Sequence, residues 1–409
     1  PTARDFSPAE AIFPQEYFGM PQVVGALLAG LILGPSMLGI LSKTEFITSI
    51  AELGVIVLMF SAGLETDIKE LKKTGKASFI IALLGVVFPI IGGFLVSYFF
   101  NKPGMIESDA GCSIFLQNVF VGVILTATSV SITVETLKEM GKLKTRSGNA
   151  ILGAAIIDDI LGIVALTIVT SLADPTVNVA VVLLKIVAFF AFSLIVGYIF
   201  YKVYKKWTAS AERGLHRHVI IAFVFCLLMA YCAEQFFGVA DITGAYIAGL
   251  IISNTERSAC VQSKFDTLSY LLLSPVFFAS IGLQVQIPHM TPMIIAFTLI
   301  LVIVAVITKI IGCGLGAKLC GYMPYQYRRI GVGMISRGEV ALIVASKGAA
   351  LGMLGSAFMG PVVIVVVITT IITPILLKIV FKKGPEHYVT KEESVSDYHE
   401  QVQDMRKDV

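Results

Sequence analysis

Long apolar runs dominate the chain, and they constrain its fold more than any other feature. About 20 apolar residues in a helix cross the hydrocarbon core of a bilayer, and such runs recur along almost all of the 409 residues. Only 14% of the residues are charged and the mean hydropathy is +0.85, whereas soluble domains contain about 25% charged residues. The sequence therefore predicts an all-α polytopic membrane protein.

A scan for these runs predicts about twelve transmembrane helices. The predicted spans are 17–41, 48–65, 76–100, 114–137, 148–172, 177–203, 217–236, 238–253, 266–284, 291–317, 330–349 and 354–381. The segment 1–16 lacks the pattern of a signal peptide, and the charged residues 384–409 are expected to form a solvated tail.

Lysine and arginine residues cluster in alternate loops between these spans. The loops around 138–146, 202–217 and 318–329 are basic, whereas the intervening loops contain only Lys43 and Lys102. Basic loops remain in the cytoplasm, so we expect both termini to be cytoplasmic. The net charge is only +3, and this placement of the basic residues gives no support for nucleic-acid binding. The six cysteines have no metal-ligand spacing, and no cofactor is expected.

An internal repeat relates the two halves of the chain. Gly25-Ala26 and Ala29-Gly30-Leu31-Ile32 recur 219 residues later, and the same offset relates Ser61, Gly63 and Leu64 to a second Ser, Gly and Leu. The loop charges place the starts of the two copies on opposite sides of the membrane. Helix packing through small residues can produce similar glycine patterns, but it does not demand a constant offset. The sequence thus predicts an inverted-topology repeat, which is typical of secondary transporters.

Two adjacent aspartates, Asp158 and Asp159, lie in the middle of the fifth predicted span. A charge at this depth costs about 2.5–3.5 kcal/mol or more, so its presence indicates a function. Asp158 lies about 15 Å from the end of its span, at 1.5 Å per residue. Lys309 lies about 13 Å from the same side of the membrane by the same rise. We therefore expect an acid and a base to share one depth.

Polar residues interrupt two further spans at a similar level. Span four contains Thr126, Thr128 and Ser129, and span eleven contains Arg337 and Glu339. Where a helix unwinds inside a transporter, free carbonyls and hydroxyls can bind a cation. However, Thr and Ser also bond back to their own helix, so the ligand roles of these hydroxyls remain open. For Arg337 and Glu339 we favour a structural ion pair over a gating pair.

Two acidic residues near predicted span ends, Glu65 and Glu135, are expected to face water or lipid headgroups.

These motifs resemble the cation:proton antiporter superfamily, and specifically the electrogenic sodium/proton antiporters of the NapA and NhaA type. The resemblance runs from about Tyr17 to Phe381. It rests on these segments: Gly30-Leu-Ile-Leu-Gly-Pro35, Ala51-Glu-Leu-Gly54, Gly63-Leu-Glu65, Thr126-Ala-Thr-Ser-Val130, Gly153-Ala-Ala-Ile-Ile-Asp-Asp159, the Lys309 helix and Arg337-Gly-Glu-Val340.

The resemblance implies a core domain with two crossed broken helices, which moves against a dimerisation domain by an elevator-like mechanism in a homodimer. It assigns 17–73 and 216–285 to the dimerisation domain, 74–172 and 286–383 to the core, and 173–215 to a linking helix and loop. Asp159 would carry sodium and protons, Asp158 would pair with Lys309, and Thr126, Thr128 and Ser129 would belong to the ion site. Sodium would bind at Asp159, Thr128 and Ser129. The resemblance also implies an extra first helix, which we do not expect within residues 1–16, because this segment is too short and polar to span.

The sequence thus favours electrogenic exchange of sodium, with lithium as a second substrate, for protons. A potassium/proton antiporter of the same superfamily is the nearest alternative, followed by a sodium-coupled organic-solute symporter. An aspartyl protease needs two facing carboxylates, and adjacent residues on one helix diverge by about 100°. We therefore do not expect an enzyme; the expected partners are ions, protons and membrane lipids.

Overall fold

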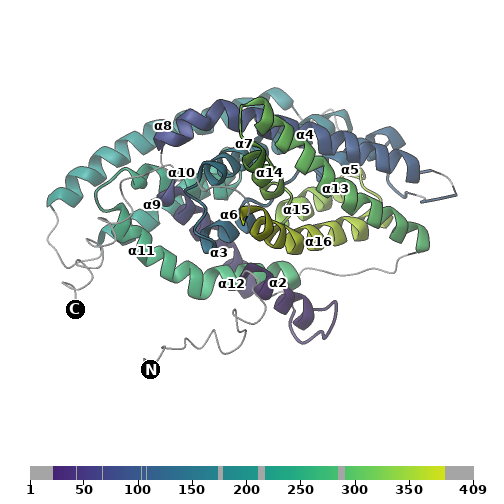
Figure 1. The fold of residues 1–409 in the computed structure, drawn as a ribbon, viewed down its shortest axis with the longest axis horizontal. Coiled ribbons are helices and arrows are strands. Elements are labelled where there is room, and N and C mark those ends of the chain that lie inside the picture. Colours follow the sequence, from purple (N-terminus) through teal and green to yellow (C-terminus); the bar gives the residue numbers. More distant parts are fainter. Residues whose placement is uncertain are drawn as a thin grey trace.

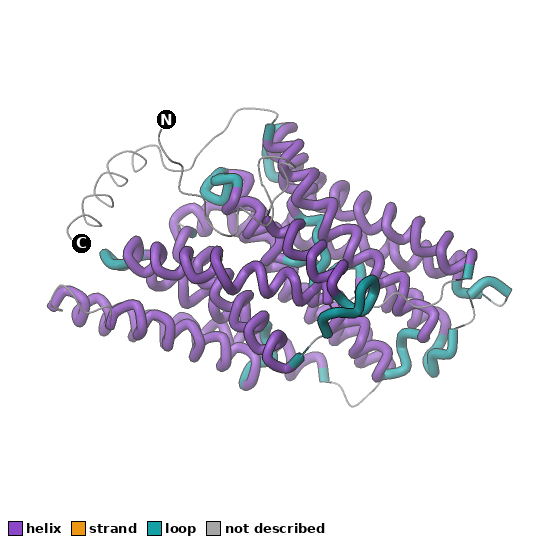
Figure 2. Tube along the Cα trace, turned by 90° about the horizontal axis from the view of Figure 1, so that it is seen from below, coloured by secondary structure: helices purple, strands orange, loops and turns teal. Residues whose placement is uncertain are grey.

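The fold was taken from a computed structural model, which describes residues 22–42, 44–66, 68–102, 104–106, 108–173, 178–210, 217–283 and 291–382. Every regular element in these ranges is helical (Figure 2), so the predicted all-α fold is confirmed. The predicted terminal segments 1–16 and 384–409 lie outside the described residues.

Eight helical segments in these ranges are long and apolar enough to cross a membrane, which confirms a multi-pass membrane protein. One of them is continuous from α11 (Ser258–Leu268) through a π-helical turn, η1 (Ser269–Leu273), to α12 (Ser274–Leu283). The other seven are α3 (Glu45–Glu65), α4 (Ile68–Phe100), α7 (Arg146–Ala173), α8 (Val179–Ser210), α9 (Arg217–Gln235), α13 (Pro292–Leu319) and α16 (Ser356–Phe381).

The other four predicted spans take two different forms. The first and the eighth correspond to short helices, α2 (Gln22–Leu33) and α10 (Asp241–Ser253). The prediction of helix as far as residue 41 was wrong, because α2 ends at Leu33, just before Gly34-Pro35. A proline disfavours the helical conformation in the residue that precedes it. Spans four and eleven are each broken: α5 (Ile114–Ile124) is followed by α6 (Val130–Glu139), and α14 (Pro324–Gly333) by α15 (Glu339–Ala350).

The glycines of the repeat lie where helices from the two halves cross. Gly30 of α2 packs on the backbone of Ala279 in α12, and its counterpart Gly249 of α10 packs on the backbone of Phe60 in α3. A β-carbon at either glycine would collide with the opposing carbonyl, so the close approach requires glycine there. The second pair, Gly63 and Gly282, contacts α10 and α2 in the same reciprocal manner. The repeat therefore has a packing role at two equivalent helix crossings.

The helices form two groups in their packing (Figure 1). In one group α4 packs on α5, α7 and α13, and α13 packs on α14 and α16. In the other group α3 packs on α10 and α12, α2 on α12, and α9 on α10. Helix α6 packs on α7 and α16 of the first group and on α2 and α3 of the second. The two broken helices belong to the first group, and the two groups meet at α6 and where α16 packs on α2.

Candidate functional site

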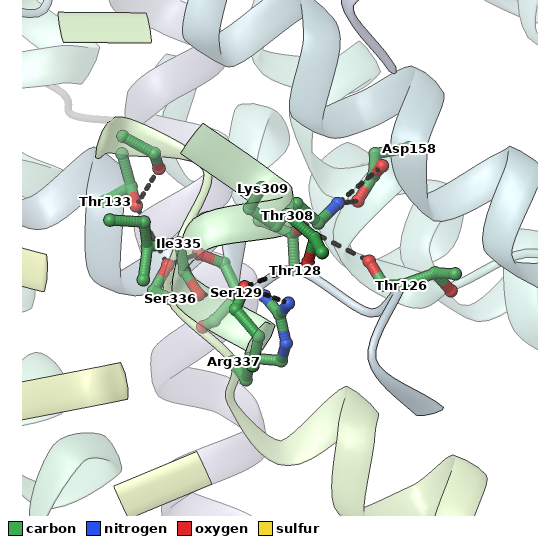
Figure 3. A network of polar contacts seen from close by, with 12 residues as sticks. Thr126, Thr128, Ser129, Thr133, Asp158, Thr308, Lys309, Ile335, Ser336 and Arg337 are labelled. Carbon is green, nitrogen blue, oxygen red and sulfur yellow. Dashed lines mark hydrogen bonds and ion pairs between the residues drawn. The ribbon is translucent and has the colours of Figure 1, made fainter. Parts of the chain in front are cut away.

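A buried ion pair joins α7 to α13 at the centre of the first helix group. The Lys309 ammonium donates to both carboxylate oxygens of Asp158, with both Nζ to O distances 2.9 Å (Figure 3). Lys309 is 0% exposed and Asp158 is 2% exposed. The two residues expected at a common depth therefore contact one another directly. Because each charge is matched, the pair can exist far from water.

A glycine on α4 lies beside this ion pair and leaves room for the Cys313 sulfur. A β-carbon on Gly85 would lie 2.5 Å from the Cys313 sulfur and 3.7 Å from both Asp158 Oδ1 and Lys309 Nζ. The protein interior is packed almost as densely as an organic crystal, so an added methyl group at this buried position would have no space. Gly85 thus allows α4 and α13 to pack closely beside the pair, and no sequence signal distinguishes it from the other helix-packing glycines.

The neighbouring Asp159 is only partly buried, unlike Asp158. The break between α5 and α6 lies beside the helix that carries both aspartates. The hydroxyl of Thr126 in this break lies 4.0 Å from the position of a β-carbon on Gly162, which is less than one helical turn beyond Asp159. Residues three and four apart share a helix face, so the link between α5 and α6 faces the aspartate side of α7.

The three predicted hydroxyl ligands make local hydrogen bonds, in which Thr126 and Thr128 are the donors. Thr126 donates to the carbonyl of Val123 at 2.7 Å, and Thr128 donates to the carbonyl of Thr126 at 3.4 Å. The Ser129 hydroxyl bonds with that of Ser131 at 3.1 Å. A hydroxyl oxygen that donates its proton still has two lone pairs, so these local bonds leave acceptor positions that a cation can use.

The two helix breaks bond to each other across the centre of the molecule. The Ser129 amide donates to the Ser336 carbonyl at 2.8 Å, and the Ser336 hydroxyl donates back to the Ser129 carbonyl at 2.8 Å. Thr133 donates to the Gly333 carbonyl at 2.7 Å and lies 3.0 Å from the Ser336 hydroxyl (Figure 3). These contacts satisfy backbone groups that unwinding leaves without helical partners. The sequence did not indicate the role of Thr133.

Arg337 lies in the second break and stabilises it by hydrogen bonds to backbone carbonyls. Its guanidinium is 0% exposed and donates to the carbonyl of Ile335 at 2.8 Å and to that of Ala305 in α13 at 3.0 Å. Thr370 of α16 donates to the Arg337 carbonyl at 2.6 Å. The positive charge therefore lies just beyond the C-terminal end of α14, where carbonyl dipoles attract a cation. The side chain of Glu339, the expected partner of Arg337, lies outside the described part of the structure.

Comparison with known proteins decides the family. The sequence matches the family described as "Sodium/hydrogen exchanger, transmembrane" over residues 11–383. The chain belongs to the sodium/hydrogen exchanger family. It is therefore a transporter and not an enzyme.

Relatives of this exchanger cover nearly its whole length. It is 40% identical over 364 residues to the Na(+)/H(+)-K(+) antiporter GerN of Bacillus cereus, covering 89% of this chain and 90% of the relative. It is 37% identical over 375 residues to a Na(+)/H(+) antiporter of Enterococcus hirae, covering 90% and 93%. Its fold resembles the sodium proton antiporter MjNhaP1 of Methanocaldococcus jannaschii, with a TM-score of 0.63 at 18% identity, covering 90% and 92% of the two chains.

Three charged residues of the exchanger do not lie where the sequence placed them. The side chain of Glu65, expected to face water or headgroups, is only 10% exposed and binds Lys138 of α6 at 3.3 Å. Arg329, taken as a residue of a basic loop, is buried in α14 and donates to the carbonyls of Val380 and Phe381 at the end of α16. The expectation that Glu135 faces water was also wrong, because α2 and α12 cover it. In all three cases a charged residue near a span end is enclosed by helices that are distant in the sequence.

Proposed function

We propose that this transporter exchanges sodium for protons electrogenically, as do the NapA and NhaA type antiporters, with lithium as a second substrate. The observation that carries the proposal is the buried ion pair of Asp158 and Lys309 next to a second, less buried carboxylate. The less buried carboxylate is a site where sodium and protons can compete, and the lysine of the ion pair is a second group that can release a proton.

In this proposal Asp159 is the principal carrier. Its carboxylate binds either a proton or a sodium ion, and the lone pairs of Thr128 and Ser129 complete the oxygen shell. Thr126 shapes the same link between α5 and α6. Arg337 stays fixed and stabilises the break between α14 and α15, together with Glu339 in a structural pair. Competition at one carboxylate makes the exchange obligatory, because the empty charged site is costly to move through the membrane.

Lys309 supplies the second proton. When sodium enters, Asp158 turns from Lys309 to the ion, and the ammonium, now buried without its partner, releases a proton. Two protons then move against one sodium ion, so one net charge crosses per cycle. A membrane potential of about 100 mV supplies about 2.3 kcal/mol for that charge, which supports roughly a 50-fold sodium gradient.

The movement is proposed to be an elevator-like displacement of residues 74–172 and 286–383 against residues 17–73 and 216–285, linked by 173–215. The reciprocal glycine crossings and the hydrogen bonds between the two helix breaks support this inverted-repeat architecture with about twelve transmembrane helices. The loop charges support cytoplasmic termini. We also propose a homodimer, by resemblance to the family.

Potassium is the second candidate cation. GerN, at 40% identity, is named a Na(+)/H(+)-K(+) antiporter, and a site of one carboxylate and hydroxyl oxygens does not by itself exclude the larger ion. Exchange measured with sodium, lithium and potassium in turn separates the candidates.

Replacement of Asp159 tests the proposed site. Purified protein in liposomes with a pH-sensitive dye should exchange protons for sodium, and Asp159→Asn should abolish both fluxes, because an amide has no negative charge and carries no exchangeable acid proton. Asp109→Asn, which alters an exposed aspartate that accepts the Ser356 amide, is the matched control and should retain exchange. Exchange at the wild-type rate in Asp159→Asn would contradict the assignment of Asp159 as the principal carrier.

A further inference from the structure

A carboxyl group outside the aspartate pair is buried, and one of its oxygens has no hydrogen-bond partner among the described residues. Glu135 lies on α6, and only 5% of its surface is exposed. Its Oε2 atom accepts no hydrogen bond from any described residue. A buried carboxylate without a partner costs several kcal/mol, so this position requires an explanation.

Glu135 lines a narrow cavity between α6, α2 and α12 that has no room for a water molecule. The rest of the lining comes from α2 and α12 and consists of Gln22, Val23, Ala26, Ser274, Pro275 and Phe278. The side-chain amide of Gln22 donates to the Tyr270 carbonyl at 3.4 Å. The walls are mostly apolar, and the hydroxyl of Ser274 is already bonded to that of Ser269 at 2.9 Å. This contact bridges the π-helical turn η1, and turns of this kind are frequent at functional sites. The cavity thus offers Glu135 little polar compensation.

The charged groups around Glu135 are engaged with one another. Lys138, one helical turn further along α6, binds Asp266 of α11 at 2.5 Å and Glu65 of α3 at 3.3 Å. Glu139 accepts the backbone amide of Gln22 in α2 at 2.7 Å. These four residues, three of them acidic, are the described charges that act on Glu135.

Beyond them, Lys378 of α16 acts on Glu139, while the residues of α2 and α12 that line the cavity are uncharged. The one base near Glu135 therefore already serves two other carboxylates, and the surrounding charge disfavours a further negative group.

We propose that Glu135 is a proton-binding site, separate from the aspartate pair, that is filled while α6 packs against α2 and α12 and is emptied when this contact opens. A proton removes the cost of a buried charge as long as the cavity is closed. Since α6 belongs to the helix group with the broken helices and α2 and α12 belong to the other group, relative movement of the groups would expose the carboxyl to water and release the proton. Glu135 would thus couple the pH on the side of the basic 138–146 loop to the contact between the groups.

The test uses the whole protein and does not need transport. Infrared difference spectra of the wild type should contain a carbonyl band of a protonated carboxyl group that disappears as the pH is raised. Glu135→Gln should lack this band, whereas Glu139→Gln, which alters the neighbouring acid on the same helix, should retain it. Because the infrared spectra do not depend on ion exchange, this test of Glu135 is independent of the proposal for Asp159.

Thermal stability gives a second readout. If the folded protein holds a proton that the unfolded chain releases, the unfolding equilibrium of the wild type should shift toward unfolding by up to about tenfold per pH unit as the pH rises through this titration. Glu135→Gln should lose this component and match the wild type at low pH. Spectra and stability profiles of Glu135→Gln that superimpose on those of the wild type would overturn the proposal. Failure of the variant to assemble would also contradict it, since Gln has the shape and neutrality of a protonated Glu.

Discussion

The two helix breaks have similar geometry but different chemistry. The break between α5 and α6 contains the hydroxyls of Thr126, Thr128 and Ser129, and it faces the helix with the aspartates. The break between α14 and α15 contains Arg337, whose guanidinium binds two carbonyl oxygens. One break presents neutral oxygens with spare lone pairs, and the other contains a fixed positive charge.

This difference suggests a division of roles between equivalent parts of the fold. A cation can approach the hydroxyl-lined break, whereas the guanidinium both repels a cation and occupies the carbonyls that could bind one. We infer that the first break belongs to the ion site and the second supports it. Substitutions in the first should therefore change ion affinity, and substitutions in the second should change stability.

The largest effect is expected from Arg337→Met. The substitution removes a charged donor from two buried carbonyls, those of Ile335 and Ala305, and should lower the free energy of unfolding by about 3 kcal/mol. Thermal unfolding in detergent measures the loss. Arg337→Lys keeps the charge and should recover part of the stability, because a single ammonium cannot reproduce the fixed fork of a guanidinium. Unchanged stability in Arg337→Met would show that the Arg337 guanidinium does not stabilise the second break.

A smaller, separable effect is expected from Thr128→Val. Loss of one oxygen ligand should weaken the apparent sodium affinity by about tenfold, or about 1.4 kcal/mol, with little change in thermal stability. The matched control is Thr133→Val, which removes a hydroxyl of the clasp between the breaks. It should lower stability and leave sodium affinity unchanged. Equal affinity in Thr128→Val and the wild type would move the ligand shell away from this hydroxyl.

The sequence predicted the membrane helices well, because apolar runs and bilayer thickness are both local quantities. It also located the two breaks, since polar residues such as Thr126 and Arg337 in the middle of a span need local partners. The depth argument that paired Asp158 with Lys309 depended only on helix rise and loop charge. These signals are carried by each segment independently of its neighbours in the fold.

What the sequence could not predict depends on which helices become neighbours. The clasp of Thr133 with Ser336 joins segments 203 residues apart, and the space that Gly85 leaves beside the ion pair depends on α13. Glu135 and Arg329 looked like exposed residues near span ends because the helices that cover them are distant in the chain. Long-range packing, rather than local propensity, decides whether such charges are buried.

The most direct test of the account is the voltage dependence of sodium flux. Wild-type protein in liposomes is given a potential with a potassium ionophore, and sodium flux is followed together with Lys309→Gln. We predict that wild-type flux follows the imposed potential and that Lys309→Gln exchanges slowly and without regard to it, because one of two titrating groups is gone. Wild-type flux that ignores the potential, or Lys309→Gln flux that follows it as in the wild type, would contradict a second proton on Lys309.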